Sequence, residues 1–189
     1  MIERTEQLTI EEFVRQYDEA PFEIINGRFI PVHPPLYGHS IAIKFIYDAI
    51  ILFDHDHQFG EAYTETTFIL EYQPDWVAGS RVPDISFFRK ERLTAYRASQ
   101  ENYRDKPLAL IPDLVVEVVS KHDTYSEVNE KIDAYLDDGV ELIWIVDTQR
   151  KRITVYETGK QPITLGESDF VSGGAVIPGF ELKLSTVFE

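Results

Sequence analysis

Apolar residues recur along this chain with the two-residue period of strands in some stretches and with the wider spacing of helices in others. Between Pro112 and Ser120, four valines and a leucine surround Glu117. So continuous an apolar run is typical of a strand that is buried on both faces. The two-residue period puts Glu117 on one face with Val115 and Val119. The pattern predicts a buried carboxylate at a functional site; the simpler alternatives are pairing with one arginine or a strand end that faces water.

Three stretches have the spacing of amphipathic helices. The first covers residues 9–17 and begins with a capping box of the Thr-x-x-Glu type. The second covers residues 39–53 and is apolar on almost every side, which indicates burial against a sheet or a subunit contact as well. The third covers residues 126–138 and should end at Gly139, since glycine is the usual residue after a helix.

Most of the remaining apolar runs predict strands. Residues 22–25 and 28–32 flank Asn26-Gly27, a pair that suits the left-handed positions of a type I′ turn, so they should form a hairpin. If the helix over 126–138 is a right-handed crossover, the strand after it runs parallel to the strand of Glu117. Further β structure is expected at 64–72, 82–88, 142–146, 153–156 and in the closing tail, 176–184.

Three connections have no clear period. A turn that contains Gly79 should join the strands 64–72 and 82–88. Residues 54–57 read Asp-His-Asp-His, but adjacent side chains point in several directions, so a solvated loop is favoured over a metal site there. The stretch 89–111 should be partly helical. It contains six of the 18 lysines and arginines, and forms either a local basic strip or an ordinary solvated loop.

The composition is that of a folded, acidic protein. Its length of 189 residues fits a single domain over 1–189, with residues 1–21 as an N-terminal helical extension. The chain has no cysteine, which excludes disulfides and thiolate metal sites. Because it shows no signal-peptide pattern and no membrane-length apolar run, a soluble cytoplasmic protein without a membrane partner is expected. The net charge of −15 argues against a broad nucleic-acid-binding surface.

Asp84 and Glu117 are the candidate chemical groups. Asp84 falls in the predicted strand 82–88, and Glu117 lies on a later strand. Carboxylates that project from neighbouring strands offer the hard oxygen ligands that suit Mg²⁺ or Mn²⁺. Such ions polarise phosphoryl oxygens and activate water. A carboxylate pair also serves glycosidases, but these would need a sugar-stacking cleft, which the sequence does not reveal.

Six short segments then follow one another in the order of a known family. They are Val82-Pro83-Asp84-Ile85, residues 112–120, Glu130-Lys131, Gly139-Val140, residues 144–147 and Pro178-Gly179-Phe180. With this ordered set the chain resembles the Uma2 family of restriction-endonuclease-like proteins, a branch of the PD-(D/E)XK nuclease superfamily. The resemblance runs from about Phe22 to Phe188.

The resemblance implies an α/β fold of the mixed α+β kind: a mixed β-sheet flanked by helices, with N-terminal and C-terminal β-hairpins. It also implies that Asp84 and Glu117 hold the metal together with a backbone carbonyl near Val118. The superfamily's lysine stands two residues after the glutamate, where this chain has Val119. Lys131, in the family's Glu-Lys pair, is the expected substitute as catalytic lysine, and an ordinary exposed helix lysine is the alternative.

Three further residues are weaker candidates. Glu23 matches a family position and would be a further metal ligand, or only the polar face of a hairpin. His39 also matches, as a contact to metal or phosphate, or only as a helix cap. At Lys121 the family usually has proline. Since Lys121 shares the face of Glu117 by alternation, it could rival Lys131.

The function that the resemblance implies is that of a Mg²⁺- or Mn²⁺-dependent endonuclease that hydrolyses phosphodiester bonds of DNA as a homodimer. A dimer would supply two cuts and more contact surface than one acidic chain. The rival hypothesis is a catalytically silent member of the family that acts as a binding or scaffold homodimer. The Asp84 and Glu117 pair favours the nuclease, whereas the net charge and the valine at position 119 favour the silent protein.

Overall fold

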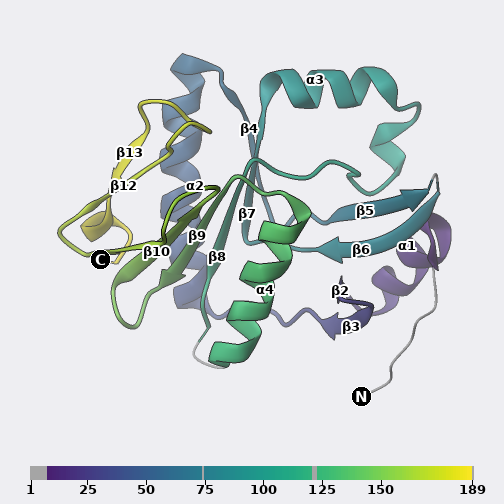
Figure 1. The fold of residues 1–189 in the computed structure, drawn as a ribbon, viewed down its shortest axis with the longest axis horizontal. Coiled ribbons are helices and arrows are strands. Elements are labelled where there is room, and N and C mark those ends of the chain that lie inside the picture. Colours follow the sequence, from purple (N-terminus) through teal and green to yellow (C-terminus); the bar gives the residue numbers. More distant parts are fainter. Residues whose placement is uncertain (1–7, 74, 121–122, 189) are drawn as a thin grey trace.

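The structure is a computed structural model that describes residues 8–73, 75–120 and 123–188. Its centre is a six-stranded sheet in the order β11-β10-β9-β8-β7-β4 (Figure 1). Strands β8 and β9 are parallel and the other neighbours are antiparallel, as expected for a mixed sheet. These strands are β4 (Gly60–Thr64), β7 (Ile85–Arg89), β8 (Leu114–Val118), β9 (Leu142–Asp147), β10 (Arg152–Glu157) and β11 (Ile163–Gly166).

Two helices cover opposite faces of the central sheet. Helix α2 (Tyr37–His57) packs into the same core cluster as Val116 and Trp144. Helix α4 (Tyr125–Asp138) packs into a second cluster with Val115 and Ile143. Because neighbouring residues of β8 point to opposite faces, the strand is buried on both sides, as its sequence predicts.

Local signals determine where α4 begins and ends. The Thr124 hydroxyl accepts the N–H of Glu127, and the Glu127 carboxylate accepts the N–H of Thr124, which completes a capping box. Gly139 follows the helix with a φ of 93°, a left-handed conformation in which glycine carries no steric cost. The crossover through α4 then makes β9 parallel to β8, as expected.

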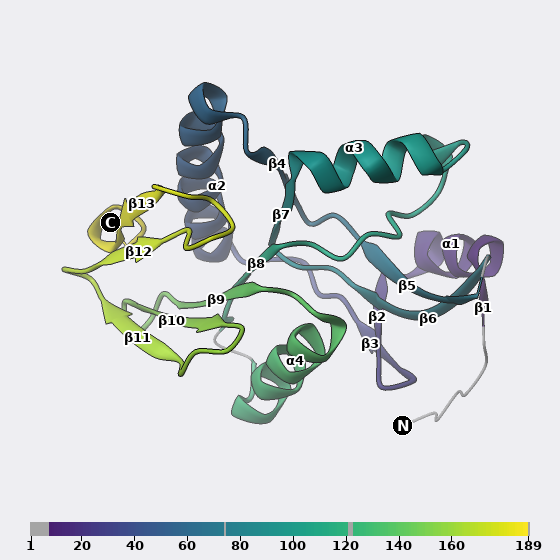
Figure 2. The ribbon, with the colours of Figure 1, turned by 45° about the horizontal axis from the view of Figure 1, so that its top comes forward.

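A second, five-stranded sheet lies beside the first. Its order is β1-β6-β2-β3, and β5 pairs with β6. Helix α1 (Ile10–Glu19) packs on it through Phe13, and the predicted capping box of Thr9 and Glu12 is present. Figure 2 shows the β2–β3 hairpin next to α4, where Arg28 bonds Glu130. The strands are β1 (Leu8–Thr9), β2 (Phe22–Ile25), β3 (Arg28–Pro31), β5 (Phe68–Gln73) and β6 (Trp76–Arg81).

The rest of the chain packs around these two sheets, and its C-terminal part joins the core cluster of α2. Helix α3 (Lys90–Ser99) directly follows β7, and a 3-10 turn, η1 (Tyr103–Asp105), comes after it. The basic stretch is therefore partly helical, as predicted. The C-terminal segment contains β12 (Phe170–Ser172), β13 (Glu181–Lys183) and the 3-10 turn η2 (Leu184–Thr186). Strands β12 and β13 form the expected antiparallel pair, but residues 176–180 of the predicted tail form turns between them.

The predicted strand over 64–72 is wrong in its bounds. β4 ends at Thr64 and β5 begins only at Phe68. Glu65 breaks the strand because its φ of 49° lies in the left-handed region, which an extended strand cannot contain. The two halves then join different sheets.

The predicted turn around Gly79 is also wrong, because this glycine lies inside β6. A Cβ atom at Gly79 would stand 3.1 Å from the Leu70 side chain and 3.2 Å from the carbonyl oxygen of Ile24. Both neighbours come from strands on either side of β6. Glycine is needed here for close approach of three strands rather than for a turn.

Two further boundaries differ from the sequence prediction. The strand predicted over 82–88 begins only at Ile85, so Asp84 lies in the bend before β7. Residues 54–57, predicted as a loop, continue α2, which ends where Gln58 adopts a left-handed φ of 55°. Among the described residues, no helix is long and apolar enough to cross a membrane.

Candidate active site

The two predicted carboxylates meet at the carboxyl end of β8. The antiparallel pairing of β7 with β8 ends at Ile85 and Val116, so Asp84 and Glu117 each stand one residue beyond the last pair. The Oδ2 atom of Asp84 also accepts the N–H of Val118 at 2.6 Å, which fixes the bend before β7 to the end of β8.

His39 approaches the same carboxylate from the first turn of α2. Its Nε2 atom lies 2.9 Å from Oδ1 of Asp84, and both side chains are mostly buried. Burial works to lower the pKa of His39, but the hydrogen bond and the charge of Asp84 outweigh it, so the pKa is raised. His39 is therefore not a helix cap, since it bonds a carboxylate on another element; Leu36 occupies the cap position.

Lys131 reaches the site from α4 on the other face of the sheet. Its ammonium nitrogen lies 3.0 Å from Oε2 of Glu23 and 3.3 Å from Oε2 of Glu117. Burial works to lower the pKa of Lys131, but the charges of Glu117 and Glu23 outweigh it and raise the pKa. The lysine is thus a charged member of the cluster and not an exposed helix residue.

Glu23 belongs to β2 of the second sheet and is only 3% exposed. One of its oxygens faces Lys131, and the other accepts the N–H of Val82 at 2.9 Å. These two contacts connect the β2–β3 hairpin to α4 and to the segment just before Asp84. Glu23 therefore holds Lys131 between two carboxylates of different sheets.

Tyr135 is a member of the cluster that the sequence pattern missed, because its aromatic ring fits the apolar stripe of α4. The side chain is fully buried, and its hydroxyl donates to Oε1 of Glu117. Burial, together with the charge of Glu117, raises the pKa of Tyr135 well above its usual value. The available signal was spacing: Tyr135 stands four residues after Lys131, so both side chains lie on one side of the helix.

The environment of Glu117 disfavours its charged form. Burial, opposed by the charge of Lys131, raises the pKa of Glu117 to about 7, and the negative charges of Asp84 and Glu23 add to the rise. A carboxyl group with this pKa can change its protonation state near neutral pH. It would also gain from any cation that replaces the missing positive charge.

A small cavity of about 70 Å³ leads to this cluster between the end of β8 and the start of α4. Its lining includes Glu117, Lys131, Asp123 and Glu127. The cavity has room for about two water molecules, whose share of liquid volume is about 30 Å³ each. The cluster is thus reached by solvent without being open to it on all sides.

The donor atoms at the end of β8 suit a hard divalent cation. Among residues 8–73, 75–120 and 123–188, no three His, Asp or Glu side chains form a group that could hold a metal by themselves. Mg²⁺, however, commonly binds through one or two carboxylates and keeps several waters. Asp84 and Glu117 meet that requirement, and the excess negative charge around Glu117 favours it. The residues present therefore fit such an ion.

Two predicted participants are not placed by these contacts. The Val118 N–H bonds Asp84, while the metal-binding role of its carbonyl group stays a prediction. Lys121 lies outside the described residues, so its rivalry with Lys131 stays a prediction as well.

The basic stretch after β7 does not form a free basic strip. All six of its basic side chains have partners within the described part of the chain. For four of the six, the partner is a carboxylate. Arg97, for example, bonds both oxygens of Glu61 at 2.6 and 2.7 Å. The four that are ion-paired are less available to phosphates.

Known proteins resemble this chain in sequence and in fold. The model of the Uma2 family, described as "Putative restriction endonuclease", matches residues 10–185. No curated protein matches the chain significantly. Among solved structures, the fold is similar to that of a putative nuclease belonging to DUF820 from Anabaena variabilis ATCC 29413. The TM-score is 0.76 and the identity 22%, over 96% of this chain and 97% of the other. The likeness establishes the fold.

Proposed function

Because the chain belongs to the Uma2 family, we propose that it is a metal-dependent endonuclease that hydrolyses phosphodiester bonds of DNA. One observation carries the proposal. Asp84, Glu117 and Lys131 come from three separate elements and meet at the end of β8. Two carboxylates and a lysine are the groups that a metal-assisted attack on a phosphodiester requires.

Asp84 and Glu117, with the carbonyl group of Val118, would hold Mg²⁺ or Mn²⁺. Such an ion supplies Lewis-acid stabilisation of the charge that develops on the phosphoryl oxygens. His39 holds Asp84 through one oxygen, and the N–H of Val118 holds it through the other. Tyr135 likewise holds one oxygen of Glu117. These contacts orient both carboxylates before substrate arrives.

Lys131 is the proposed catalytic lysine, because Val119 occupies the position at which the superfamily has its lysine. Its ammonium group carries a full charge at the site and can donate to a phosphoryl oxygen or to the attacking water. Glu23 fixes this ammonium group from the side opposite to Glu117, so Glu23 is proposed as a positioning residue rather than a metal ligand.

A homodimer is also proposed, with the outer face of α2 as the contact. Tyr37, Phe45 and Leu52 are 83%, 41% and 73% exposed and lie on one side of this helix. Exposed apolar patches of this kind mark protein interfaces. Replacing Phe45 and Leu52 together by glutamate should convert a dimer to a monomer in analytical ultracentrifugation.

The test of the nuclease proposal is DNA cleavage with and without divalent metal. Purified protein should nick or cut plasmid and linear DNA in Mg²⁺ or Mn²⁺, and a chelator should stop the reaction. Glu117→Gln should remove cleavage while keeping the fold, and Glu167→Gln, a change at a surface carboxylate, should have no effect. Absence of cleavage by the wild-type protein on any DNA with any divalent ion would favour the catalytically silent binding protein.

A further inference from the structure

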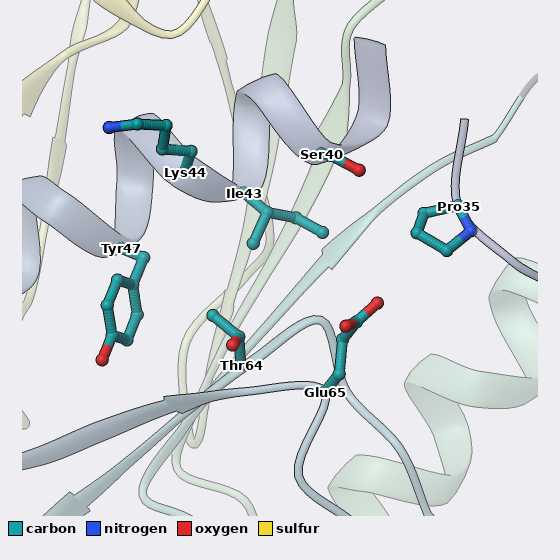
Figure 3. Close-up of a pocket in the computed structure, with 7 residues that line it drawn as sticks. All are labelled: Pro35, Ser40, Ile43, Lys44, Tyr47, Thr64 and Glu65. Atoms are coloured by element: carbon teal, nitrogen blue, oxygen red, sulfur yellow. The ribbon is translucent and has the colours of Figure 1, made fainter. Parts of the chain in front are cut away.

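A second and larger cavity lies beside the candidate active site, between α2 and the turn from β4 to β5. Its volume is about 320 Å³. Figure 3 shows Pro35, Ser40 and Glu65 at one end, Lys44 and Tyr47 at the other, and Ile43 and Thr64 between them. Small-molecule sites typically begin at about 300 Å³, so the space suits one compact ligand rather than a long chain segment.

Three backbone connections tie this cavity to the active-site residues. Ser40 directly follows His39, whose ring bonds Asp84. The N–H of Glu65 donates to the carbonyl oxygen of Asp84 at 3.2 Å. Thr64 is the register partner of Ile85, the residue after Asp84. A ligand in the cavity would therefore lie immediately next to whatever binds at Asp84 and Glu117.

The side chains of the cavity combine three kinds of contact. Ile43 and Pro35 provide apolar surface, and Ser40, Thr64 and Tyr47 provide hydroxyl groups. Lys44 and Glu65 carry opposite charges, and the ammonium group of Lys44 is paired with Asp48 one turn further along α2. Apolar surface with a few polar and charged groups is the usual composition of a site for a small organic ligand.

Glu65 is held in an uncommon backbone conformation at this position. Its φ of 49° lies in the left-handed region, which few residues other than glycine adopt. The bond from its N–H to Asp84 fixes that conformation. Figure 3 shows its carboxylate directed toward Pro35 and Ser40 and not toward Lys44. An ionised carboxylate only accepts hydrogen bonds, so its partner must present N–H or O–H donors.

We propose that this cavity binds one nucleotide of the DNA substrate, next to the phosphate that is cleaved, and that Glu65 selects a base with N–H donors. This inference rests on the proposed nuclease function. Lys44 would exchange its contact with Asp48 for one to a backbone phosphate, and Pro35 with Ile43 would cover part of the base. Guanine fits Glu65 best, because its N1–H and N2–H groups lie side by side and can reach both carboxylate oxygens. Thymine fits poorly, because its single N–H stands between two carbonyl oxygens that the carboxylate repels.

The experiment measures binding of single nucleotides to the metal-free full-length protein by NMR. The probes are the 5′-monophosphates of deoxyguanosine and deoxythymidine. Addition of the guanine nucleotide should shift the amide signals of Ser40, Thr64 and Glu65. Its dissociation constant should be at least about fivefold lower than that of the thymine nucleotide, which is the lower limit for a good bidentate contact to a base.

Two variants separate the phosphate contact from base selection. Glu65→Gln should remove most of the preference for guanine, because the amide presents a donor in place of one acceptor oxygen. Lys44→Ala should weaken both nucleotides by a similar factor, since a phosphate contact does not depend on the base. Glu101→Gln changes an exposed carboxylate away from the cavity and should alter neither constant. Signal shifts elsewhere, or constants that neither cavity variant changes, would overturn the proposal.

DNA cleavage separates this inference from the nuclease proposal. If the protein binds the guanine nucleotide in the cavity but cuts no DNA, the nucleotide site stands and the nuclease proposal falls. If the protein cuts DNA, Glu65→Gln should change which bases flank the cut. Cleavage with the same flanking bases and the same rate in both cavity variants would overturn the nucleotide site and leave the nuclease proposal intact.

Discussion

Strand β8 has a carboxylate at each end, and the two carboxylates have opposite electrostatic environments. Asp113 stands just before the strand, and Glu117 is its fourth residue. Both are removed from water by the same sheet. They differ in how much positive charge surrounds them. The cluster of Asp113 stabilises the fold, whereas the cluster of Glu117 is suited to catalysis.

At the first end the charges balance. The Asp113 side chain is fully buried and lies 2.7 Å from Arg89 and 2.9 Å from Arg92. It also accepts the backbone N–H of Arg89 at 2.9 Å, and Arg89 bonds Glu141 through its two terminal guanidinium nitrogens. Two guanidinium groups thus face two carboxylates, with the lone pairs of Asp113 occupied. Such a cluster has little to gain from a further ion.

Among the described residues, the charges at the second end do not balance. Glu117, Glu23 and Asp84 share one ammonium group, that of Lys131, and one histidine. Burial raises the pKa of Glu117 against the opposing charge of Lys131, and the remaining deficit of positive charge beside Asp84 and Glu23 adds to the rise. A deficit of this kind destabilises the folded protein unless a cation or a proton relieves it. Its presence at the end of a buried strand is therefore better explained by function than by stability.

The largest expected effect is loss of stability when the balanced cluster is broken. Asp113→Ala removes the bonds of a buried carboxylate to the N–H and guanidinium group of Arg89 and to Arg92. Hydrogen bonds to a charged group contribute about 1.5–3 kcal/mol each, so the loss should reach about 3–5 kcal/mol. Urea unfolding followed by circular dichroism at pH 8 should show this loss. Glu117→Gln, measured without metal under the same conditions, should be no less stable than the wild type. Equal losses in the two variants would contradict the distinction between the clusters.

The next effect concerns Lys131 and is measured on activity. Lys131→Ala should lower the rate of DNA cleavage by about 10²–10³-fold, which is the usual effect of removing one group that stabilises transition-state charge. Metal binding, followed by calorimetry, should persist because the lysine acts on phosphate and water. Lys151→Ala, at a surface lysine paired with Glu167, is the control. If Lys151→Ala loses as much activity, Lys131 has no special role.

Much of the cluster around Glu117 could be predicted from the sequence, because its members lie on elements with strong hydrophobic periodicity. Glu117 interrupts a run of valines, so its burial follows from the period of the strand. Lys131 flanks the apolar stripe of α4, and the caps at Thr124 and Gly139 fix where that helix lies along the chain. The sequence predicts a strand at Asp84, which lies in a bend instead, but its bond to the N–H of Val118 still holds it at the end of β8.

The parts that were missed depend on contacts between distant segments. The strand β6 was not predicted because Gly79 resembles a turn residue until β2 and β5 are known to pack on either side of it. The bond between Glu23 and Lys131 joins residues that are 108 positions apart. The ring of Tyr135 is part of the core, so the sequence indicates only a core aromatic residue. Its hydroxyl group bonds Glu117, which the pattern does not reveal.

A smaller effect is expected from metal binding on stability. Mg²⁺ at about 100 times its dissociation constant should raise the free energy of unfolding by about 2.7 kcal/mol, because it binds the folded chain alone. Glu117→Gln should lose this response, whereas Glu167→Gln should keep it. Thermal melts with Mg²⁺ and with sodium chloride at equal ionic strength separate binding from screening. Equal responses in the wild type and Glu117→Gln would place the metal elsewhere.

The smallest effect per measured step is the pH dependence that Glu117 imposes on the metal-free protein. Its pKa is raised from 4.5 to about 7 in the folded state, so between these values the folded chain retains a proton that the unfolded chain has released. Stability due to this group is therefore present at low pH and is lost as the pH rises from about 4.5 to 7. The loss is at most about 1.4 kcal/mol per pH unit.

Glu117→Gln removes this titration, so its advantage over the wild type should grow between pH 4.5 and 7 and then stay constant. His39 also has a raised pKa and causes a loss of the same sign above its usual value of about 6.5. The raised pKa of Lys131 acts only above about 10.5, outside this range. Urea unfolding in the presence of a chelator, at half-unit steps of pH, measures the difference between the two proteins. Parallel curves would mean that Glu117 titrates like an ordinary surface glutamate, and the contrast between the two ends of β8 would lose its electrostatic basis.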